Sequence, residues 1–211
     1  MKPDWLQPLP LVAILRGLTP TEAPAIGAAL YDAGFRILEV PLNSPQPLDG
    51  IAALARGFGE RCVVGAGTVL EPAQVEAVAA AGGRLIVMPH TDAAVIAAAK
   101  RAGLPCVPGA ATPSEAFAAL RAGADALKLF PAEQLGPSVL KAWRSVLPAG
   151  TAVLPVGGIT PQRIADYRAA GAAGFGIGSA LSAPGRDAAD VARRAREFVA
   201  TWNAARTDPQ P

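Results

Sequence analysis

The sequence is poor in the residues that build metal and disulfide sites. Its 211 residues include one histidine and two cysteines. Cys62 and Cys106 lack the CxxC spacing of metal sites, and each lies in an apolar, strand-like run. We therefore expect two reduced, buried thiols, no bound metal and no cofactor.

The sequence also lacks strong charge bias and long hydrophobic runs. The formal net charge is +2, and the basic residues are scattered rather than gathered with aromatic residues into a nucleic-acid-binding patch. No run of about 18 apolar residues is long enough to span a membrane. Residues 1–5 lack the features of a signal peptide. These observations predict a cytoplasmic protein with no nucleic-acid partner and no membrane partner.

What the sequence does contain is apolar material for one core. Hydrophobic residues make up 51% of the chain, and 211 residues are too few for two ordinary domains. We expect one domain over residues 1–211. The segment from about residue 206 is expected to be flexible, since Pro209 and Pro211 cannot continue a helix.

Short apolar runs alternate with alanine-rich stretches of helical pattern. This alternation is typical of β-α-β units with a parallel sheet. Eight repetitions predict a (β/α)8 barrel; a doubly wound open sheet is the alternative, but it requires a reversal of strand order. The expected strands are residues 11–15, 36–41, 62–66, 85–88, 105–108, 126–130, 152–156 and 174–178.

Recurring dipeptides mark the two ends of the expected helices. A capping residue or an early proline predicts helix starts at Thr19-Pro20, Ser44-Pro45, Glu71-Pro72, Thr112-Pro113 and Thr160-Pro161. Ala-Gly pairs predict helix ends at Ala33-Gly34, Ala81-Gly82, Ala102-Gly103, Ala122-Gly123 and Ala170-Gly171, because glycine adopts left-handed backbone conformations readily.

Two charged residues interrupt apolar strands. Side chains alternate between the two faces of a strand, so Lys128 faces inward if Leu127 and Leu129 face the helices. The same argument turns Glu39 into the barrel. Burial lowers the pKa of an amine and raises that of a carboxyl group, which suits a nucleophile and a proton carrier. The alternatives are a lysine that reaches the rim and a structural Glu–Lys ion pair.

Other polar residues follow the expected strands, at the end of a barrel where active sites lie. Arg16 is positioned to hold a substrate carboxylate with its guanidinium group. Thr68 either binds substrate or caps the helix that begins near Pro72. His90 lies at the same rim, where it either touches substrate or has no catalytic role.

Glycine clusters follow the seventh and eighth expected strands. Loops at these two positions of a barrel often bind phosphate through backbone N–H groups. The residues expected to bind phosphate are Gly157, Gly158, Gly178 and Ser179.

Taken together, these segments resemble the lysine-dependent 2-keto-3-deoxy-6-phosphogluconate and 6-phosphogalactonate aldolases over nearly the whole chain. The resemblance implies a trimeric (β/α)8 barrel, a Schiff base on Lys128, proton transfer by Glu39, and cleavage of a phosphorylated keto-deoxy sugar acid into pyruvate and glyceraldehyde 3-phosphate. The matching segments are Val12-Ala13-Ile14-Leu15-Arg16-Gly17, Leu38-Glu39-Val40-Pro41-Leu42-Asn43-Ser44-Pro45, Gly65-Ala66-Gly67-Thr68-Val69-Leu70, Leu127-Lys128-Leu129-Phe130-Pro131 and Val156-Gly157-Gly158-Ile159-Thr160-Pro161.

At two positions this sequence differs from the gluconate-type aldolases and resembles the galactonate type. The segment after Glu39 reads Pro41-Leu42-Asn43-Ser44 instead of Thr-Leu-Arg-Thr, and Val156 stands where threonine usually precedes the glycine pair. The resemblance thus implies the galactonate substrate, with the gluconate epimer and 4-hydroxy-2-oxoglutarate as alternatives. A non-catalytic barrel that binds or senses a sugar phosphate is the alternative outside enzymes.

Overall fold

The computed structural model describes residues 3–205. The tail expected to be flexible from about residue 206 lies outside them. The strands are β1 (Leu11–Ile14), β2 (Ile37–Pro41), β3 (Val63–Gly67), β4 (Ile86–Val87), β5 (Cys106–Val107), β6 (Gly109–Ala110), β7 (Leu127–Leu129), β8 (Val153–Pro155) and β9 (Phe175–Ile177). The helices are α1 (Ala23–Asp32), α2 (Pro47–Phe58), α3 (Pro72–Ala80), α4 (Ala93–Arg101), α5 (Pro113–Arg121), α6 (Ala132–Arg144), α7 (Ile164–Ala169) and α8 (Ala188–Ala204), with 3-10 turns η1 (Asp4–Leu6) and η2 (Pro161–Arg163).

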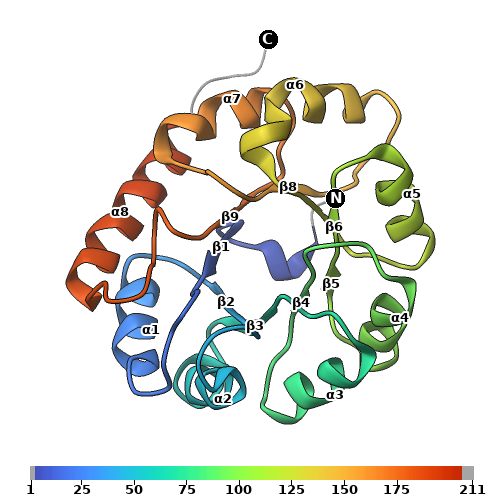
Figure 1. The fold of residues 1–211 in the computed structure, drawn as a ribbon. Helices are drawn as coiled ribbons and strands as arrows, with labels where there is room; N and C mark the ends of the chain where they lie inside the picture. The colour runs from blue at the N-terminus through green and yellow to red at the C-terminus, as the bar shows by residue number, and fades with distance from the viewer. Residues whose placement is uncertain (1–2, 206–211) are drawn as a thin grey trace.

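All strand pairs are parallel and fall into two sheets. One has the order β5-β4-β3-β2-β1-β9, and the other has the order β6-β7-β8. A bridge between Val156 and Gly176 joins β8 to β9, while a single residue separates β5 from β6. The result is a curled parallel sheet with the helices outside it, a TIM-like α/β arrangement (Figure 1). In residues 3–205 the strands follow one another without the order reversal of a doubly wound sheet.

One expected strand is wrong in its extent. Residues 105–108 do not form one strand; β5 and β6 lie on either side of Pro108. Proline has no N–H to donate to a neighbouring strand, which interrupts the ladder at this position. The Pro108 carbonyl still accepts a hydrogen bond from the Lys128 N–H at 2.9 Å, so the chain stays alongside β7.

Three of the expected helix starts are confirmed in position and two are wrong. α3, α5 and the η2–α7 segment begin at Pro72, Pro113 and Pro161, whereas α1 begins at Ala23 and α2 at Pro47. Before α1, the Glu22 carboxylate accepts hydrogen bonds from both the N–H and the hydroxyl of Thr19, which forms a separate turn. The five expected Ala-Gly ends are confirmed, each with its glycine at positive φ: Gly34, Gly82, Gly103, Gly123 and Gly171.

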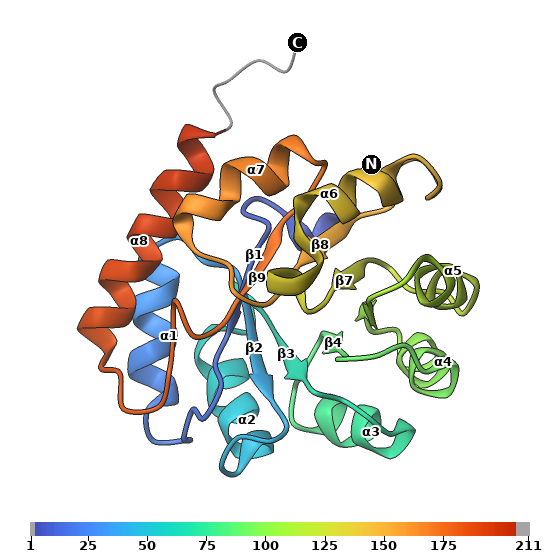
Figure 2. The same cartoon turned by 45° about the horizontal axis from the view of Figure 1, so that its top comes forward.

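Apolar side chains fill both sides of the curled sheet. One cluster lies between strands and helices, and it includes Leu38, Val40, Leu127 and Leu129. A second, smaller cluster lies inside the ring of strands, where η1 contributes the fully buried Leu6. Figure 1 shows this N-terminal turn crossing the middle of the ring, and Figure 2 shows β1, β2 and β3 running side by side inside the helix layer.

The two cysteines are free and buried, as expected from their apolar surroundings. Burial raises the pKa of the Cys106 thiol to about 12, and the nearby Asp125 carboxylate adds to this rise. Both thiols are therefore packing residues. Across residues 3–205, no helix is long and apolar enough to cross a membrane.

Candidate active site

Lys128 lies on β7 and points into the ring of strands. Its neighbours Leu127 and Leu129 are fully buried in the outer cluster, and period-two alternation therefore turns Lys128 inward. The side chain is 7% exposed, and Nζ lies 4.7 Å from the centre of the Phe130 ring. Burial lowers the pKa of Lys128; the Arg16 charge lowers it further, while the Glu39 carboxylate opposes this shift. The pKa shift favours the uncharged, nucleophilic amine.

Glu39 lies on β2 and enters the same space from the opposite wall of the ring. Leu38 and Val40 face the helices, and the Glu39 side chain is 2% exposed. Burial raises the pKa of Glu39 to about 7, although the charges of Lys128 and Arg16 hold it down in part. A carboxyl group with this pKa can both accept and donate a proton near neutral pH.

The two buried groups are neighbours without being an ion pair. Among the described residues, Oε2 of Glu39 has no hydrogen-bond partner, and no ion pair joins Glu39 to Lys128. A buried carboxylate oxygen without a partner in the protein leaves one hydrogen-bonding position of Glu39 available to a ligand in the cavity. This arrangement disfavours a purely structural ion pair.

A cavity of about 500 Å³ opens above these two side chains, at the carboxyl ends of the strands. This volume is typical of a site for a small-molecule ligand. All eight residues expected at the site line it: Arg16, Glu39, Thr68, Lys128, Gly157, Gly158, Gly178 and Ser179.

Arg16 and Thr68 occupy the rim of the cavity. Arg16 follows β1 and is exposed, so its guanidinium is free to meet a ligand. Thr68 does not cap a helix: Glu71 is the N-cap of α3, and Gln74 completes the capping box. The Thr68 backbone is left-handed, with φ of 55°. This conformation costs a β-branched residue about 1–3 kcal/mol and is concentrated at functional sites.

The two glycine-rich loops at the cavity mouth follow the neighbouring strands β8 and β9. Gly157 and Gly158 have φ of 105° and 61°, a conformation that favours glycine. A Cβ atom on Gly157 would lie 2.6 Å from Oε2 of Glu133, and one on Gly158 would lie 2.8 Å from the Glu133 Cβ. The glycine pair therefore allows the loop after β8 to pack directly on the first turn of α6.

Sequence reasoning missed several residues of the site. Glu133, Thr160 and Ala180 line the cavity. Glu133 stands two residues after Pro131, and this closeness to the Lys128 segment was the available signal. His90 is exposed and does not line the cavity. Within residues 3–205, no group of three or more His, Cys, Asp or Glu side chains is arranged to hold a metal ion.

The fold and the cavity define a TIM-like α/β protein. Its cavity is lined by a buried amine, a buried carboxyl group and two glycine-rich loops. The model of the aldolase family described as KDPG and KHG aldolase matches residues 4–194. The chain therefore belongs to the KDPG and KHG aldolase family, which confirms the resemblance seen in the sequence.

Individual relatives agree with this family. The chain is 47% identical over 202 residues to the 2-dehydro-3-deoxy-6-phosphogalactonate aldolase of Escherichia coli strain K12, covering 96% of this chain and 98% of that protein. A solved structure described as "Native KDPGal structure" is 46% identical, with a TM-score of 0.96 over 99% of this chain and 100% of that one. A cube-shaped protein cage designed by fusing symmetric oligomeric domains matches with 47% identity and a TM-score of 0.93, over 94% of this chain and 73% of that one.

Proposed function

We propose that this chain is a class I aldolase that cleaves 2-dehydro-3-deoxy-6-phosphogalactonate to pyruvate and D-glyceraldehyde 3-phosphate. The observation that carries the proposal is the burial of Lys128 and Glu39 in one cavity without an ion pair between them. The name of the Escherichia coli relative, at 47% identity, supports the galactonate substrate. The gluconate epimer and 4-hydroxy-2-oxoglutarate are the alternative substrates.

The reaction begins at the C2 ketone of the substrate. The neutral amine of Lys128 adds to this carbon, and Glu39 transfers the protons that let the carbinolamine lose water and become an iminium. Glu39 then accepts the C4 hydroxyl proton while the C3–C4 bond breaks, and the bonding electrons pass into the iminium. The aldehyde leaves, the resulting enamine is protonated at C3, and water releases pyruvate and the free lysine.

The rim residues hold the two charged ends of the substrate. Arg16 binds the carboxylate, because a guanidinium fork matches its geometry. The phosphate is bound by backbone N–H groups of Gly157, Gly158, Gly178 and Ser179. Thr68 binds the keto acid through its hydroxyl. These assignments are supported by the position of all six residues around the cavity.

We also propose that residues 1–211 form one (β/α)8 barrel domain that assembles as a cytoplasmic homotrimer. Hydrogen bonds from β8 to β9 and from β9 to β1 support closure of the barrel. The match to a cage built from symmetric oligomeric domains supports self-association. Sedimentation equilibrium at micromolar concentration should give three times the chain mass of 21.4 kDa.

Borohydride trapping with pyruvate tests the chemistry. We expect reduction to leave a stable adduct on Lys128, located by peptide mass spectrometry, and no adduct in Lys128→Ala. Lys100→Ala is the matched control, since Lys100 pairs with Asp125 on the surface and should leave the adduct intact. A folded wild-type protein without an adduct would instead indicate a binding or sensing role.

Substrate preference needs a separate measurement. We expect kcat/KM to be highest for 2-dehydro-3-deoxy-6-phosphogalactonate when it is compared with the gluconate epimer and 4-hydroxy-2-oxoglutarate. A higher kcat/KM for either of the other two compounds would indicate that this compound is the preferred substrate.

A further inference from the structure

The loop between β9 and α8 connects the cavity with an ionic cluster on the outer surface. Gly178, Ser179 and Ala180 line the cavity. The Gly178 carbonyl accepts hydrogen bonds from the N–H groups of Leu181 and Ser182 at 2.8 and 2.9 Å, which closes a tight turn. The carbonyl groups of the next two residues point to arginine side chains.

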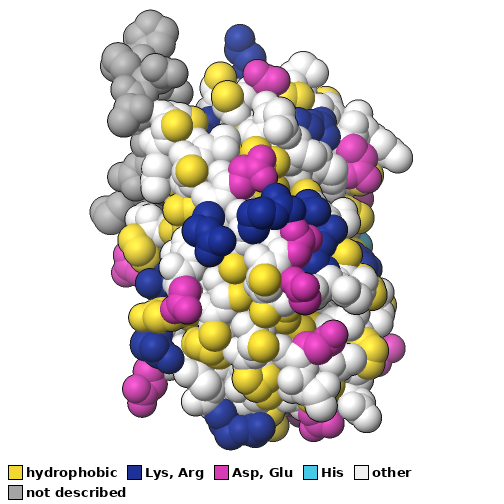
Figure 3. Space-filling view, turned by 90° about the vertical axis from the view of Figure 1, so that its left-hand side faces the viewer, with side chains coloured by type: hydrophobic (Ala, Val, Ile, Leu, Met, Phe, Trp, Pro, Cys, Tyr) yellow, Lys and Arg dark blue, Asp and Glu magenta, His cyan; other side chains and the backbone are white. Residues whose placement is uncertain are grey.

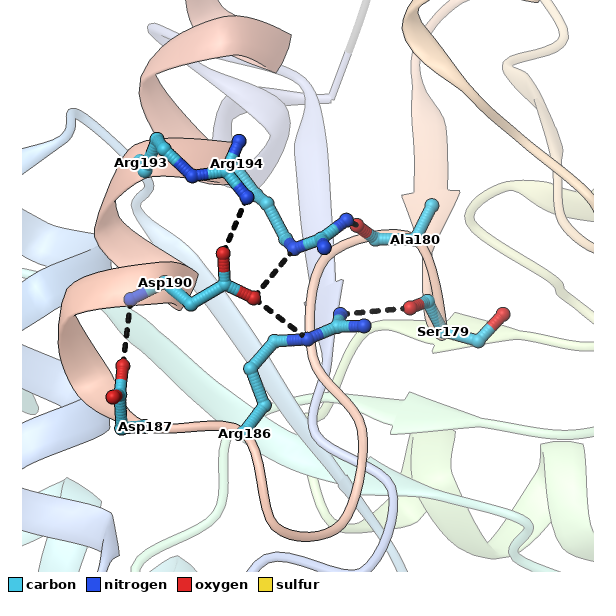
Figure 4. A network of polar contacts seen from close by, with 7 residues as sticks. All are labelled: Ser179, Ala180, Arg186, Asp187, Asp190, Arg193 and Arg194. Atoms are coloured by element: carbon cyan, nitrogen blue, oxygen red, sulfur yellow. Dashed lines mark hydrogen bonds and ion pairs between the residues drawn. The ribbon is translucent and has the colours of Figure 1, made fainter.

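Each of these carbonyl groups is held by its own guanidinium. Nη1 of Arg186 donates to the Ser179 carbonyl at 2.9 Å, and Nη1 of Arg194 donates to the Ala180 carbonyl at 3.2 Å. Figure 4 shows both arginines reaching the loop from the side of α8. Their side chains are 19% and 32% exposed, so both are partly packed against the protein.

Asp190 holds both arginines in place. Its Oδ2 lies 3.1 Å from Nε of Arg186 and 2.8 Å from Nε of Arg194. Its Oδ1 pairs with Arg193, which is 60% exposed and makes no hydrogen bond to the loop within the described residues. The cluster lies on the α8 side of the molecule, where Figure 3 shows basic and acidic side chains gathered in a mixed band.

Because of the geometry of the peptide unit, a contact to a loop carbonyl group also fixes the direction of the following N–H group. In a planar trans peptide the C=O and N–H bonds point in opposite directions. Arg186 engages the Ser179 carbonyl on the outer side of the loop, so the N–H of Ala180, which belongs to the same peptide unit, points to the opposite side. The preceding N–H is that of Ser179, and both residues line the cavity. Neither N–H donates a hydrogen bond to another group in residues 3–205. Two adjacent free N–H groups form a suitable site for an anion.

We propose that Asp190 is a positioning residue for the loop that meets the substrate phosphate. Through Arg186 and the Ser179 carbonyl it orients the Ala180 N–H toward the phosphate, and through Arg194 it holds the Ala180 carbonyl in the peptide unit that follows. This proposal rests on the proposed function, since a phosphorylated substrate is the anion that occupies the site. Asp190, Arg186 and Arg194 do not touch the substrate. Their effect should therefore appear in KM for phosphorylated substrates and not in the chemical step.

Two substitutions separate this role from simple attraction between arginine charges and phosphate. Asp190→Asn removes a negative charge, so attraction alone predicts tighter phosphate binding, whereas loss of orientation predicts weaker binding. Arg193→Ala is the matched control for Arg194→Ala. Both arginines pair with Asp190 and are adjacent on α8, but Arg194 also holds the loop. If breaking any ion pair with Asp190 were sufficient, the two substitutions would have similar effects.

The experiment measures steady-state cleavage of the phosphorylated substrate and of its phosphate-free analogue, using the full-length protein. We expect Asp190→Asn and Arg194→Ala to raise KM for the phosphorylated substrate roughly 10-fold, equivalent to about 1.4 kcal/mol. Their kcat should change less than about 3-fold, and kcat/KM for the analogue should stay the same. Arg193→Ala should resemble the wild type with both substrates. Retained analogue cleavage shows that each variant is folded.

A second readout does not depend on turnover. Titration with inorganic phosphate, followed by calorimetry, should give weaker binding in Asp190→Asn and Arg194→Ala and unchanged binding in Arg193→Ala. The proposal is overturned if Asp190→Asn binds phosphate as well as or better than the wild type, or if the two arginine variants behave alike. A wild-type protein that cleaves neither substrate contradicts the proposed function, and the phosphate titration alone then decides the role of Asp190.

Discussion

The Glu39 carboxylate lies against Gly67, in the space that a side chain at position 67 would fill. A Cβ atom at residue 67 would overlap the carboxyl group of Glu39. Gly67 is the last residue of β3 and Glu39 lies on the adjacent β2, so a missing side chain on one strand makes room for a charged side chain from the next.

Gly67→Ala should therefore displace the Glu39 carboxylate without unfolding the protein. We expect kcat to fall by about 10²-fold, within the range by which a positioned acid–base group accelerates a reaction. Gly57→Ala is the matched control, because nothing lies within 4 Å of a Cβ atom at that helical position. Equal activity of the two variants, with intact far-ultraviolet circular dichroism, would contradict this role of Gly67.

Removing the Glu39 charge should slow the reaction while preserving the fold. For Glu39→Gln we expect kcat to fall by about 10² to 10⁴-fold, because the amide neither accepts nor donates the proton. Glu76→Gln makes the same chemical change on the exposed face of α3 and should behave as wild type. Unchanged kcat in Glu39→Gln would show that another group carries the proton.

Glu39 should also make stability depend on pH. Its pKa rises from the ordinary value of 4.5 to about 7 in the folded protein, so the folded state binds more protons than the unfolded state between these values. The contribution of Glu39 to stability is thus fully present below pH 4.5 and is lost as pH rises through 7. Urea denaturation across this window should show stability falling with pH relative to Glu39→Gln. A constant difference between the two proteins would contradict the raised pKa.

Arg16→Ala should weaken substrate binding more than it slows chemistry. Arg16 is exposed at the cavity rim, so the fold should survive the change, while loss of a charge-assisted contact to a carboxylate should raise KM by about 10 to 100-fold. The same variant should need more pyruvate for borohydride trapping. Arg196→Ala, an exposed change on α8, is the control. An unchanged KM would show that Arg16 does not bind the substrate carboxylate.

The central pair of the site could be predicted from sequence because strand alternation is a local property. Once Leu127 and Leu129 are assigned to the helix side, the direction of Lys128 follows, and the same holds for Glu39 between Leu38 and Val40. The structure agrees on both. The positions of the glycine-rich loops also followed from chain order, since each comes directly after a strand.

Other features depend on contacts between residues distant in sequence. Ser44 was expected to begin a helix, but it is buried and its Oγ accepts a hydrogen bond from the Gly17 N–H at 3.0 Å. That bond ties the loop after β2 to the loop that carries Arg16. The fit of Glu133 under Gly157 and Gly158 likewise requires coordinates. The proposed role of Asp190 depends on two arginines that reach loop residues 7 and 14 positions earlier in the chain.

The turn η1 places Trp5 beneath the two buried charged groups and so helps to close the barrel interior to protons. Beneath Lys128 and Glu39 the interior is lined by Trp5, Val12, Leu85, Val87, Val107 and Leu154. None of these side chains accepts a proton, and the indole of Trp5 is itself a donor whose Nε1 has no partner in the described part of the chain. This apolar floor offers Glu39 no proton acceptor. Under the proposed mechanism, the protons that Glu39 moves therefore pass to the ligand or through the open side of the cavity, and not through the core of the barrel.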